Sequence, residues 1–439
     1  MLLYHVRIAL KSLRRSLGLT AVIVGGIALG IGVASLFSTI RHSLAKDPVP
    51  RKSAVLHYVR LDSWDPARAH PNADGIPPQI SYRDAMELMK SDVPSRQTAM
   101  FKANLYVFPD PKVARPKRTL VRLCFADFFP MFDVPFKYGS GWDRKADLGP
   151  EPVIVLGEET NDLLFGGTDS VGKSVRIEDR EFRVVGVLDT WMPSVKFYDI
   201  TQNPIQPPEQ VFMPFNFVRP MQIRTAGNSD GWKGAPGPGL EGTLASDQTW
   251  IQMWAELPDA AARQRYEDFL KAYVTEQKKA GRFPRPLRVE VTPLMAWMRS
   301  QKVTPPQVTA MMVVSLLFLG VCALNLMGLL LAKFLARAPE IGVRRALGAS
   351  RKDVFIQHVV ESELVGLVGG TLGVLLALAG VAAVNGWAKV VVNRGDLVRF
   401  DAPMVFAAAG LSLAAGLLAG AYPAWRVCRI PPAIHLKLQ

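Results

Sequence analysis

The chain has 439 residues, of which 49% are hydrophobic and 21% are charged, and it carries a net charge of +14 at pH 7. This mixture excludes a soluble enzyme and a pure channel, and it is typical of membrane segments joined to a substantial soluble domain. The basic residues of the soluble part are interspersed with Asp and Glu, which argues against a nucleic-acid partner.

Four apolar stretches are each long enough to cross a bilayer, which takes about 20 residues. They are predicted transmembrane helices over residues 17–40, 308–332, 359–384 and 402–422. The first stretch is long and is not followed by an A-x-A site, so we expect an uncleaved anchor rather than a signal peptide. Residues 1–16 place their apolar side chains on one helical face, which predicts an interfacial amphipathic helix or an extension of the first membrane helix.

Basic residues gather before the first stretch, between the second and third, and after the fourth. The positive-inside rule therefore places both termini in the cytoplasm. The first outside segment is also basic, which argues mildly the other way, but large domains cross largely regardless of charge. The three cysteines fall in three different compartments, so no intrachain disulfide is expected. The predicted soluble segments are the outside domain 41–307, the cytoplasmic loop 333–358, the short outside loop 385–401 and the cytoplasmic tail 423–439.

The outside domain reads as mixed α and β. A helix is expected to begin at Ser81, whose side chain can cap it together with Asp84. The region between residues 203 and 242 is rich in proline and glycine, which predicts a long loop. The fold class is therefore an α+β membrane protein with four transmembrane helices and a large mixed α/β extracytoplasmic domain between the first and second. Strands are predicted at 54–61, 118–123 and 152–156, a hairpin at 174–188, and a β-α-β pattern over 250–256, 259–276 and 287–291.

Residues 167–174 fit the phosphate-binding pattern G-x-x-x-x-G-K-[ST] at every position. We reject this interpretation because a helix-like segment precedes the run and a strand follows it, whereas a phosphate loop needs the reverse order. None of the six histidines has a partner at metal-ligand spacing, and no nucleophile elbow is present. We therefore expect no catalytic residue, cofactor site or metal site on this chain.

The loop between the second and third apolar stretches contains the most informative run of the sequence. On a helix, Glu340 pairs with Arg344 one turn later, while Ile341, Ala346 and Leu347 form an apolar strip. This pattern predicts a short docking helix, although charge alone would also fit a loop that only sets topology. Two glycines, each weakening a helix by about 1 kcal/mol, favour docking. The predicted coupling residues are Glu340, Ile341, Gly342, Arg344, Arg345, Ala346, Leu347 and Gly348.

Pairs of glycines four residues apart let membrane helices approach closely. They serve either packing within the chain or a sliding interface between subunits. Asn325 lies inside an apolar stretch and is expected to form an interhelical hydrogen bond, while Glu361 and Glu363 are expected to face protein or reach the membrane surface. The predicted packing residues are Asn325, Gly366, Gly369, Gly370 and Gly373.

Asn325, the run from Glu340 to Arg351, Glu361 and the pair Gly369-Gly370 together resemble the signature of the FtsX-like permeases of ABC transporters. Residues 152–188 resemble a MacB-like periplasmic core domain, which also accounts for the false phosphate loop. The tail from Tyr422 to Arg426 is similar to the end of the same family. The resemblance implies a mechanotransmission-type protein in the inner membrane of a Gram-negative bacterium, with residues 41–307 in the periplasm.

By this resemblance, the run around Glu340 is a coupling helix that docks on a separate ATPase chain, which carries ATP and Mg²⁺. The implied function is that of a permease subunit driving export or extraction of a peptide, antibiotic, lipid or lipoprotein. The alternative is a regulatory ABC subunit that transmits motion to a periplasmic enzyme or sensor without transport. Implied partners are the ABC ATPase, a second permease copy or paralogue, membrane lipid, and optionally a periplasmic adaptor or effector.

Overall fold

The protein was analysed as a computed structural model, which describes residues 17–72, 74–108, 116–149, 151–201, 203–346 and 348–429, without the side chains of residues 19, 344 and 346. The predicted interfacial helix over residues 1–16 lies outside the described residues. The chain forms two compact units, of which one is the segment 47–303 and the other comprises the parts before and after it. Each unit is described by itself.

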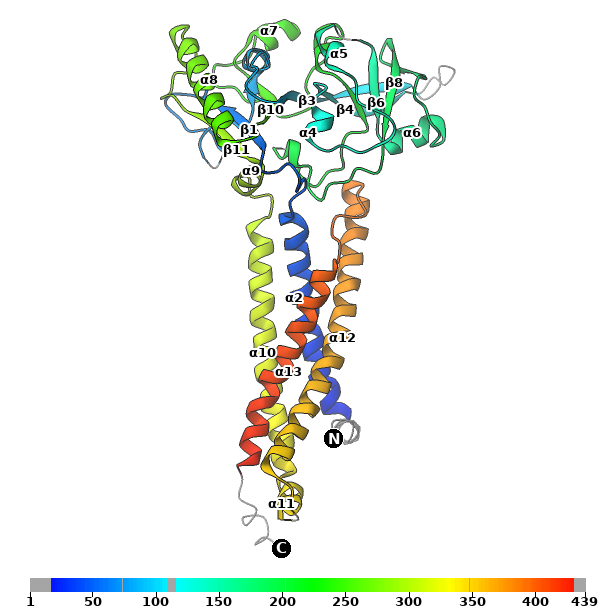
Figure 1. Ribbon diagram of the computed structural model, residues 1–439, viewed down its shortest axis with the longest axis vertical. Coiled ribbons are helices and arrows are strands. Elements are labelled where there is room, and N and C mark those ends of the chain that lie inside the picture. The colour runs from blue at the N-terminus through cyan, green and yellow to red at the C-terminus, as the bar shows by residue number, and fades with distance from the viewer. Residues whose placement is uncertain are drawn as a thin grey trace. The chain divides into compact units, whose positions relative to one another are not determined.

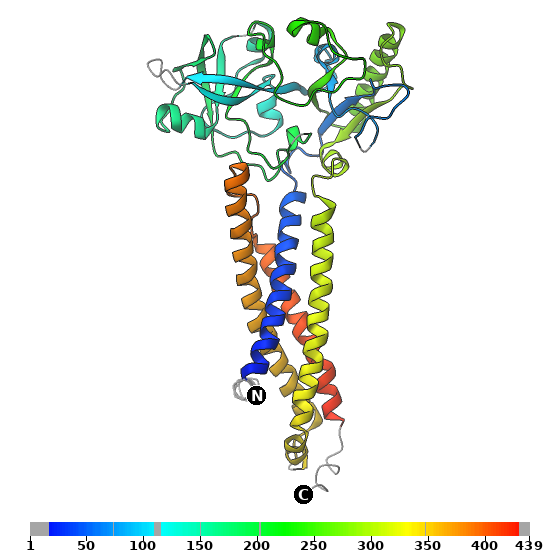
Figure 2. The ribbon, with the colours of Figure 1, turned by 180° about the vertical axis from the view of Figure 1, so that it is seen from behind.

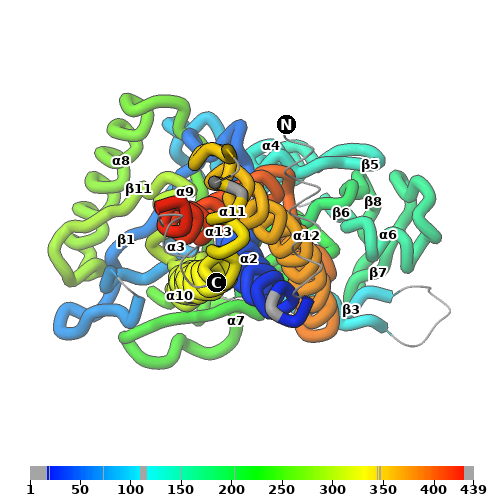
Figure 3. Tube along the Cα trace, turned by 90° about the horizontal axis from the view of Figure 1, so that it is seen from below, coloured from blue at the N-terminus to red at the C-terminus, as the bar shows by residue number. Residues whose placement is uncertain are grey.

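In the unit outside the segment 47–303, four helices of the described residues are long and apolar enough to cross a membrane. Helices are the natural form here, because in lipid every backbone polar group must be satisfied within the segment. The helices α2 and α13 each pack against both α10 and α12 (Figure 3), and Figure 2 shows α2 running beside α10. A short helix, α11, connects α10 to α12 (Figure 1). The bounds are α2 Leu17–Ala45, α10 Pro306–Ala336, α11 Ala338–Ala346, α12 Arg351–Val392 and α13 Ala402–Cys428.

The helix α12 is longer at both ends than the stretch 359–384 that hydrophobicity alone delimits. It begins where Ser350 caps it, since the Ser350 hydroxyl accepts a hydrogen bond from the backbone N–H of Asp353 at 3.1 Å. The start of α12 is therefore set by this polar capping residue, which lies outside the apolar stretch, and hydrophobicity alone does not locate it.

The described residues of the unit 47–303 contain a mixed sheet of eleven strands in the order β11-β1-β10-β3-β4-β9-β6-β8-β5, with β2 on β10 and β7 on β3 and β8. The pairs β4–β9 and β6–β8 are parallel, and the others are antiparallel. The strands are β1 Leu56–Leu61, β2 Ile80–Ser81, β3 Arg96–Phe108, β4 Lys117–Cys124, β5 Phe136–Gly139, β6 Val153–Leu156, β7 Ser174–Ile177, β8 Arg180–Leu188, β9 Val211–Pro214, β10 Thr249–Glu256 and β11 Val289–Pro293. The helices are α3 Tyr82–Leu88, α4 Phe128–Met131, α5 Arg144–Leu148, α6 Glu158–Phe165, α7 Gly239–Ala245, α8 Ala260–Lys279 and α9 Leu294–Ser300, with 3₁₀ turns η1 Phe197–Asp199 and η2 Phe215–Val218.

Several local predictions are confirmed in this unit. The Ser81 hydroxyl caps α3 by accepting from the backbone N–H of Asp84 at 3.2 Å. The strands β7 and β8 form the expected antiparallel hairpin, and β10, α8 and β11 follow the expected β-α-β order. The run 167–174 lies between α6 and β7, which is the helix-then-strand order that excludes a phosphate loop.

The prediction of one long loop over residues 203–242 is wrong in part. Residues Val211–Pro214 form β9, a buried strand between β4 and β6. This short strand is difficult to predict for two reasons. Prolines flank it, and they are typical of loops. Its sheet partners β4 and β6 also lie far away in the sequence. The longest strand, β3, was missed as well, since buried polar residues such as Lys102 interrupt the alternation expected of a half-exposed strand.

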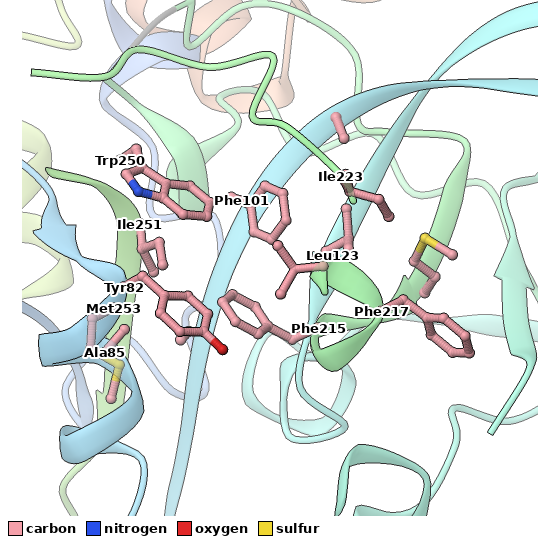
Figure 4. Packing of buried hydrophobic residues seen from close by; sticks show 14 of the residues in the cluster. Tyr82, Ala85, Phe101, Leu123, Phe215, Phe217, Ile223, Trp250, Ile251 and Met253 are labelled. Carbon is pink, nitrogen blue, oxygen red and sulfur yellow. The ribbon is translucent and has the colours of Figure 1, made fainter. Parts of the chain in front are cut away.

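The main core of this unit lies on one face of the sheet and combines aliphatic side chains with a group of aromatic rings (Figure 4). The Phe101 ring packs edge-on against Trp250 at 4.8 Å and Phe215 at 5.3 Å between ring centroids. Because side chains alternate along a strand, the neighbouring Lys102 points to the opposite face. That face is also covered, and on it Tyr58 stacks on Trp297 at 4.2 Å.

Candidate functional site

Residues 340–346 of the predicted coupling run lie in the nine-residue helix α11, Ala338–Ala346. Its side chain Ile341 is buried and joins a cluster with Phe334 of α10, Val354 of α12 and Val427 of α13. The side chains of Val343 and Glu340 are exposed on α11. The helix is therefore amphipathic, with its apolar side held against three neighbouring helices and its other side open.

Arg345 connects α11 to the end of α13. Its Nη1 donates to the backbone oxygen of Cys428 at 3.3 Å. The last carbonyls of a helix lack intrahelical donors and carry partial negative charge, so a guanidinium is a favourable partner. From the sequence, Arg345 is expected to contact only a partner protein, and its contact with Cys428 within the chain could not be foreseen.

The two glycines of the coupling run differ in their surroundings. Gly348 has a φ of +104° and no atom within 4 Å of the position that a Cβ would take. A residue other than glycine would be strained there. Gly342 is buried within α11. The turn between α11 and α12 therefore requires a glycine at position 348. The side chains of Arg344 and Ala346 and the whole of Leu347 lie outside the described part of the structure.

A buried ion pair lies where α11 meets its neighbours. Lys333 Nζ of α10 is 2.7 Å from Glu361 Oε1 of α12, and both side chains are at most 6% exposed. The other Glu361 oxygen lies 3.7 Å from His358 Nδ1, and the His358 ring contacts Phe334 at 4.0 Å between centroids. The pair joins the two helices that α11 connects. The sequence gives no sign of this pairing, because only the fold brings Lys333 to Glu361.

The packing glycines of α12 face two different helices. A Cβ at Gly369 or Gly373 would lie within 3 Å of Ile27 or Ile31 of α2. A Cβ at Gly366 would lie 3.2 Å from the Cα of Gly416 in α13, and one at Gly370 would overlap the Ser412 hydroxyl. Ser412 in turn donates to the Gly366 carbonyl at 2.7 Å. These glycines let α12 pack closely within the chain on both sides.

Asn325 differs from the expectation of an interhelical hydrogen bond within the chain. Its side chain is exposed on α10, and no described residue forms a hydrogen bond with it. The reason is geometric, because α10 turns Ser315, Leu319, Leu326 and Leu330 towards its neighbours and presents Asn325 on another face.

A buried network of charges lies on the second face of the sheet in the unit 47–303. Arg122 Nη2 is 2.7 Å from Asp199 Oδ2 and 2.5 Å from Glu209 Oε1, and Lys196 Nζ is 3.0 Å from the same Glu209 oxygen. Burial alone would raise the pKa of Glu209, but Arg122 and Lys196 outweigh it and hold that pKa well below its ordinary value. The network ties η1 and the start of β9 to β4. No sequence motif indicated it, because its members are far apart in the chain.

A cavity of about 450 Å³ opens in the same unit, lined by Phe129, Phe136 and Trp142 with Asp127 and Arg144 among its polar residues. Arg144 Nη2 lies 2.8 Å from Asp127 Oδ2. Trp142 Nε1 donates to a carboxylate oxygen of Asp147 at 3.0 Å, and the backbone N–H of Ala126 donates to the other at 2.9 Å. Burial nevertheless raises the pKa of Asp147 to about 6.

Together these features define a membrane protein whose large mixed-sheet domain is inserted between its first two spanning helices, with a short amphipathic helix between the second and third. Residues 20–273 match the family described as the MacB-like periplasmic core domain, and residues 312–432 match the FtsX-like permease C-terminal family. The chain therefore belongs to the MacB-type, FtsX-like permeases of ABC transporters.

Individual relatives are exporters by name. The pyoverdine export ATP-binding/permease protein PvdT of Pseudomonas syringae pv. tomato is 26% identical over 310 residues, which are 70% of this chain and 41% of that protein. The macrolide export ATP-binding/permease protein MacB of Brucella abortus is 37% identical over 124 residues, which are 28% of this chain and 18% of that protein. The chain thus spans less than half the length of these relatives.

Solved structures that are similar include the periplasmic region of MacB from Actinobacillus actinomycetemcomitans, at 12% identity and a TM-score of 0.35, covering 57% of this chain and 93% of that one. Another is the extracellular domain of the noncanonic ABC-type transporter YknZ from Gram-positive bacteria, at 11% identity and a TM-score of 0.33, covering 54% of this chain and 99% of that one.

Proposed function

We propose that this chain is a permease subunit that couples ATP hydrolysis on a separate ATP-binding chain to a change of shape in its domain 47–303. In this proposal α11 is the coupling helix, and ATP and Mg²⁺ are bound by the partner. The observation that carries it is α11 itself, an amphipathic helix with one open side, placed between two membrane helices inside the matched permease region. Closure of two ATPase subunits would displace α11, and stiff helices would carry the displacement along.

The contacts of α11 support this transmission. Ile341 anchors the helix in a cluster shared by α10, α12 and α13, and Arg345 links it to the Cys428 carbonyl. The pair Lys333–Glu361 joins α10 to α12, with 2.7 Å between Nζ and Oε1. A force on α11 would therefore reach several helices at once rather than bend a free loop.

The proposed work of the complex is export or extraction of a peptide, antibiotic, lipid or lipoprotein at a bacterial inner membrane. The relatives named for pyoverdine and macrolide export support this class. In this topology α11 and both termini are cytoplasmic, in agreement with the basic residues that flank the helices. Partners would be the ATPase, a second permease copy or paralogue, lipid and a periplasmic adaptor or effector.

The test is purification of the tagged full-length chain in mild detergent, with co-purifying proteins identified by mass spectrometry. We expect an ABC ATPase in near-equal amount, lost when Glu340→Ala and Arg344→Ala are combined. The matched control is Asp268→Ala with Lys271→Ala, an exposed ion pair on α8 of the other unit, which should keep the ATPase. Intact complexes that reproducibly lack an ATPase would overturn the proposal.

Arg345→Ala is informative as a separate variant, because Arg345 also contacts Cys428. The ATPase could be lost with Arg345→Ala alone and fully retained with the combined Glu340→Ala and Arg344→Ala variant. That result would mean that Arg345 acts by holding α11 against α13, and that Glu340 and Arg344 do not bind the ATPase directly. A co-purifying adaptor would favour transport, whereas a co-purifying hydrolase or sensor would favour the regulatory alternative.

A further inference from the structure

One end of the sheet in the unit 47–303 carries the cavity of about 450 Å³. The residues that line it all lie between Ala126 and Arg144, a stretch that contains α4, β5 and the start of α5. The strand β5 is the last in the order of the sheet, and we call this space the β5 cavity. Cavities of about 300–1,000 Å³ are the usual size for small-molecule sites.

The wall of the β5 cavity is built of aromatic rings that hold one another in place. The Phe129 ring packs edge-on against Trp142 at 4.8 Å and lies 5.4 Å from Phe136, between ring centroids. A Cβ at Gly141 would lie 2.5 Å from the Phe129 ring, so the glycine lets this ring lie directly against the backbone. The hydrogen bond from Trp142 to Asp147 fixes the second ring. The wall is therefore preformed, and it offers rings of the kind that attract a cation within about 6 Å of their centroids.

The single basic side chain among the described residues that line the cavity, Arg144, is already neutralised. Its Nε lies 3.2 Å from Oδ1 of Asp127 and its Nη2 lies 2.8 Å from Oδ2, which is a two-point contact. The lining also contains Asp133 and Asp143. Three carboxylates and one guanidinium leave an excess of negative charge at the cavity, on a chain whose net charge is +14.

Asp133 and Asp143 are both accessible to a ligand. The Asp133 side chain is 39% exposed, and Lys52 Nζ lies 3.6 Å from it and 3.7 Å from Glu256, so one ammonium group is shared between two carboxylates. Asp143 is exposed, and its Oδ1 accepts two backbone N–H groups at the start of α5. No basic side chain in the described part of the chain forms an ion pair with Asp143. Both carboxylates can therefore receive a positive charge from a bound molecule.

A second cavity in the same unit has no such imbalance. It measures about 390 Å³, and its lining includes Trp232, Lys233 and Asp247. Lys233 Nζ lies 2.7 Å from Asp247 Oδ2, so the one charge of each sign among its described lining residues cancels. Negative charge in excess beside aromatic rings thus distinguishes the β5 cavity.

We propose that the β5 cavity binds a small organic cation with an apolar body. The apolar body lies against Phe129, Phe136 and Trp142, and the ammonium or guanidinium group lies at Asp133 and Asp143. Burial of apolar surface supplies affinity, while the carboxylates select the positive charge, because an anion would meet like charge there. A metal ion such as Ca²⁺ does not suit this site, since it needs several oxygen ligands and the wall is aromatic.

The inference goes beyond the proposed function, which assigns no ligand site to the unit 47–303. It does not depend on that function either, because the lining residues and their contacts all belong to this unit. Its tests measure binding alone, so their outcome is separate from the co-purification of the ATPase.

The first test compares three probes that share one apolar body: phenylbutylamine, phenylbutanol and phenylbutyrate. Binding to the full-length chain in nanodiscs of zwitterionic lipid is measured by equilibrium dialysis at neutral pH, and binding to empty nanodiscs is subtracted. We expect the amine to bind about tenfold more tightly than the alcohol, and the acid to bind most weakly. High salt should reduce the preference for the amine, because charges at an open rim are screened. Equal binding of the three probes, or no binding above that of empty nanodiscs, would overturn the proposal.

The second test removes two charges by combining Asp133→Asn with Asp143→Asn. Asparagine suits both positions, because residue 133 has a φ of +47° and residue 143 is a helix N-cap. The amine should bind about tenfold more weakly to this variant, while the binding of phenylbutanol should not change.

The matched control is Asp259→Asn combined with Asp268→Asn. It also removes two charges and one N-cap carboxylate, but from α8, which packs on β11 at the other end of the strand order. This variant should bind the amine as the parent does. Unchanged amine binding in the cavity variant, or an equal loss in the control, would contradict the assigned site.

The third test concerns the apolar wall. Phe136→Ala removes the half-buried ring on β5 and should weaken the binding of the amine and of the alcohol by a similar factor, about tenfold. Phe108→Ala, which removes a half-buried ring at the end of β3, should leave both unchanged. Thermal midpoints establish that each variant is folded, and the aspartate variants remain decisive if Phe136→Ala destabilises the unit. Alcohol binding that persists in folded Phe136→Ala would place the apolar body elsewhere and refute the proposed site.

Discussion

At the scale of single residues, the buried network around Arg122 in the unit 47–303 should be sensitive to the loss of one charge. Glu209→Gln removes the carboxylate that contacts both Arg122 and Lys196, and leaves Arg122 paired with Asp199. Removing one partner of a buried pair typically costs about 3–5 kcal/mol. We expect the free energy of unfolding, measured by urea titration and tryptophan fluorescence, to fall by about that amount.

The control for this prediction is Glu241→Gln, which removes an ion pair with Arg219 that is more than half exposed on both sides. Such surface pairs contribute little. A Glu209→Gln protein as stable as the Glu241→Gln protein would show that the buried network does not stabilise the fold.

Asp147 should make the free energy of unfolding fall as the pH rises, which is the opposite of the usual effect of a carboxylate. Its folded pKa of about 6 lies above its ordinary value of 3.8, so the folded state binds the proton more tightly than the unfolded state. This stabilisation is present in full below about pH 4 and is lost as the pH rises through 6. A shift of this size corresponds to about 3 kcal/mol.

The measurement for Asp147 is the stability difference between the parent protein and Asp147→Asn at pH 4.5 and pH 7.5. The variant should gain stability relative to the parent as the pH rises. Asparagine places its amide against Ala126 N–H or Trp142 Nε1–H, which is a cost independent of pH, so only the change with pH is diagnostic. A difference that is the same at both pH values would contradict the raised pKa.

At the scale of elements, the packing of α12 against α2 depends on the absence of a side chain at Gly369. In Gly369→Ala the new Cβ would lie 2.8 Å from the Cβ of Ile27, and overpacking of this kind costs about 1–3 kcal/mol. We expect a lower thermal midpoint in detergent. Gly386→Ala on the same helix has no atom within 4 Å and should be neutral or stabilising. Equal midpoints for the two variants would mean that the helices separate to accept the methyl group.

The elements that the sequence predicts well are those defined by local patterns. Apolar length locates the four membrane helices, the Ser81 cap locates α3, and the charge pattern around Glu340 locates α11. Elements defined by distant partners were missed, because β9 needs β4 and β6 on either side and β3 carries a buried Lys102. The same reason applies to the site, since the pairing of Lys333 with Glu361 and the exposure of Asn325 depend on how the helices face one another.

At the scale of the whole molecule, the two units have separate cores. The aromatic core around Phe101, Phe215 and Trp250 contains only residues of the segment 47–303. The cluster around Ile341 contains only residues outside that segment. Under the proposed function, separate cores would let the unit 47–303 change its shape without unfolding the membrane helices.

Separate cores predict that the segment 47–303 folds when it is expressed alone. Trp250, Trp254 and Trp297 are each at most 1% exposed in this unit, so the fragment should give a strong near-ultraviolet circular dichroism signal and a cooperative urea transition. Glu209→Gln should lower the stability of the fragment and of the full chain by the same amount, because distant sites with no shared partners act independently. A fragment without fixed aromatic signals, or a smaller effect of Glu209→Gln in the full chain, would show that the membrane helices complete the fold of the soluble unit.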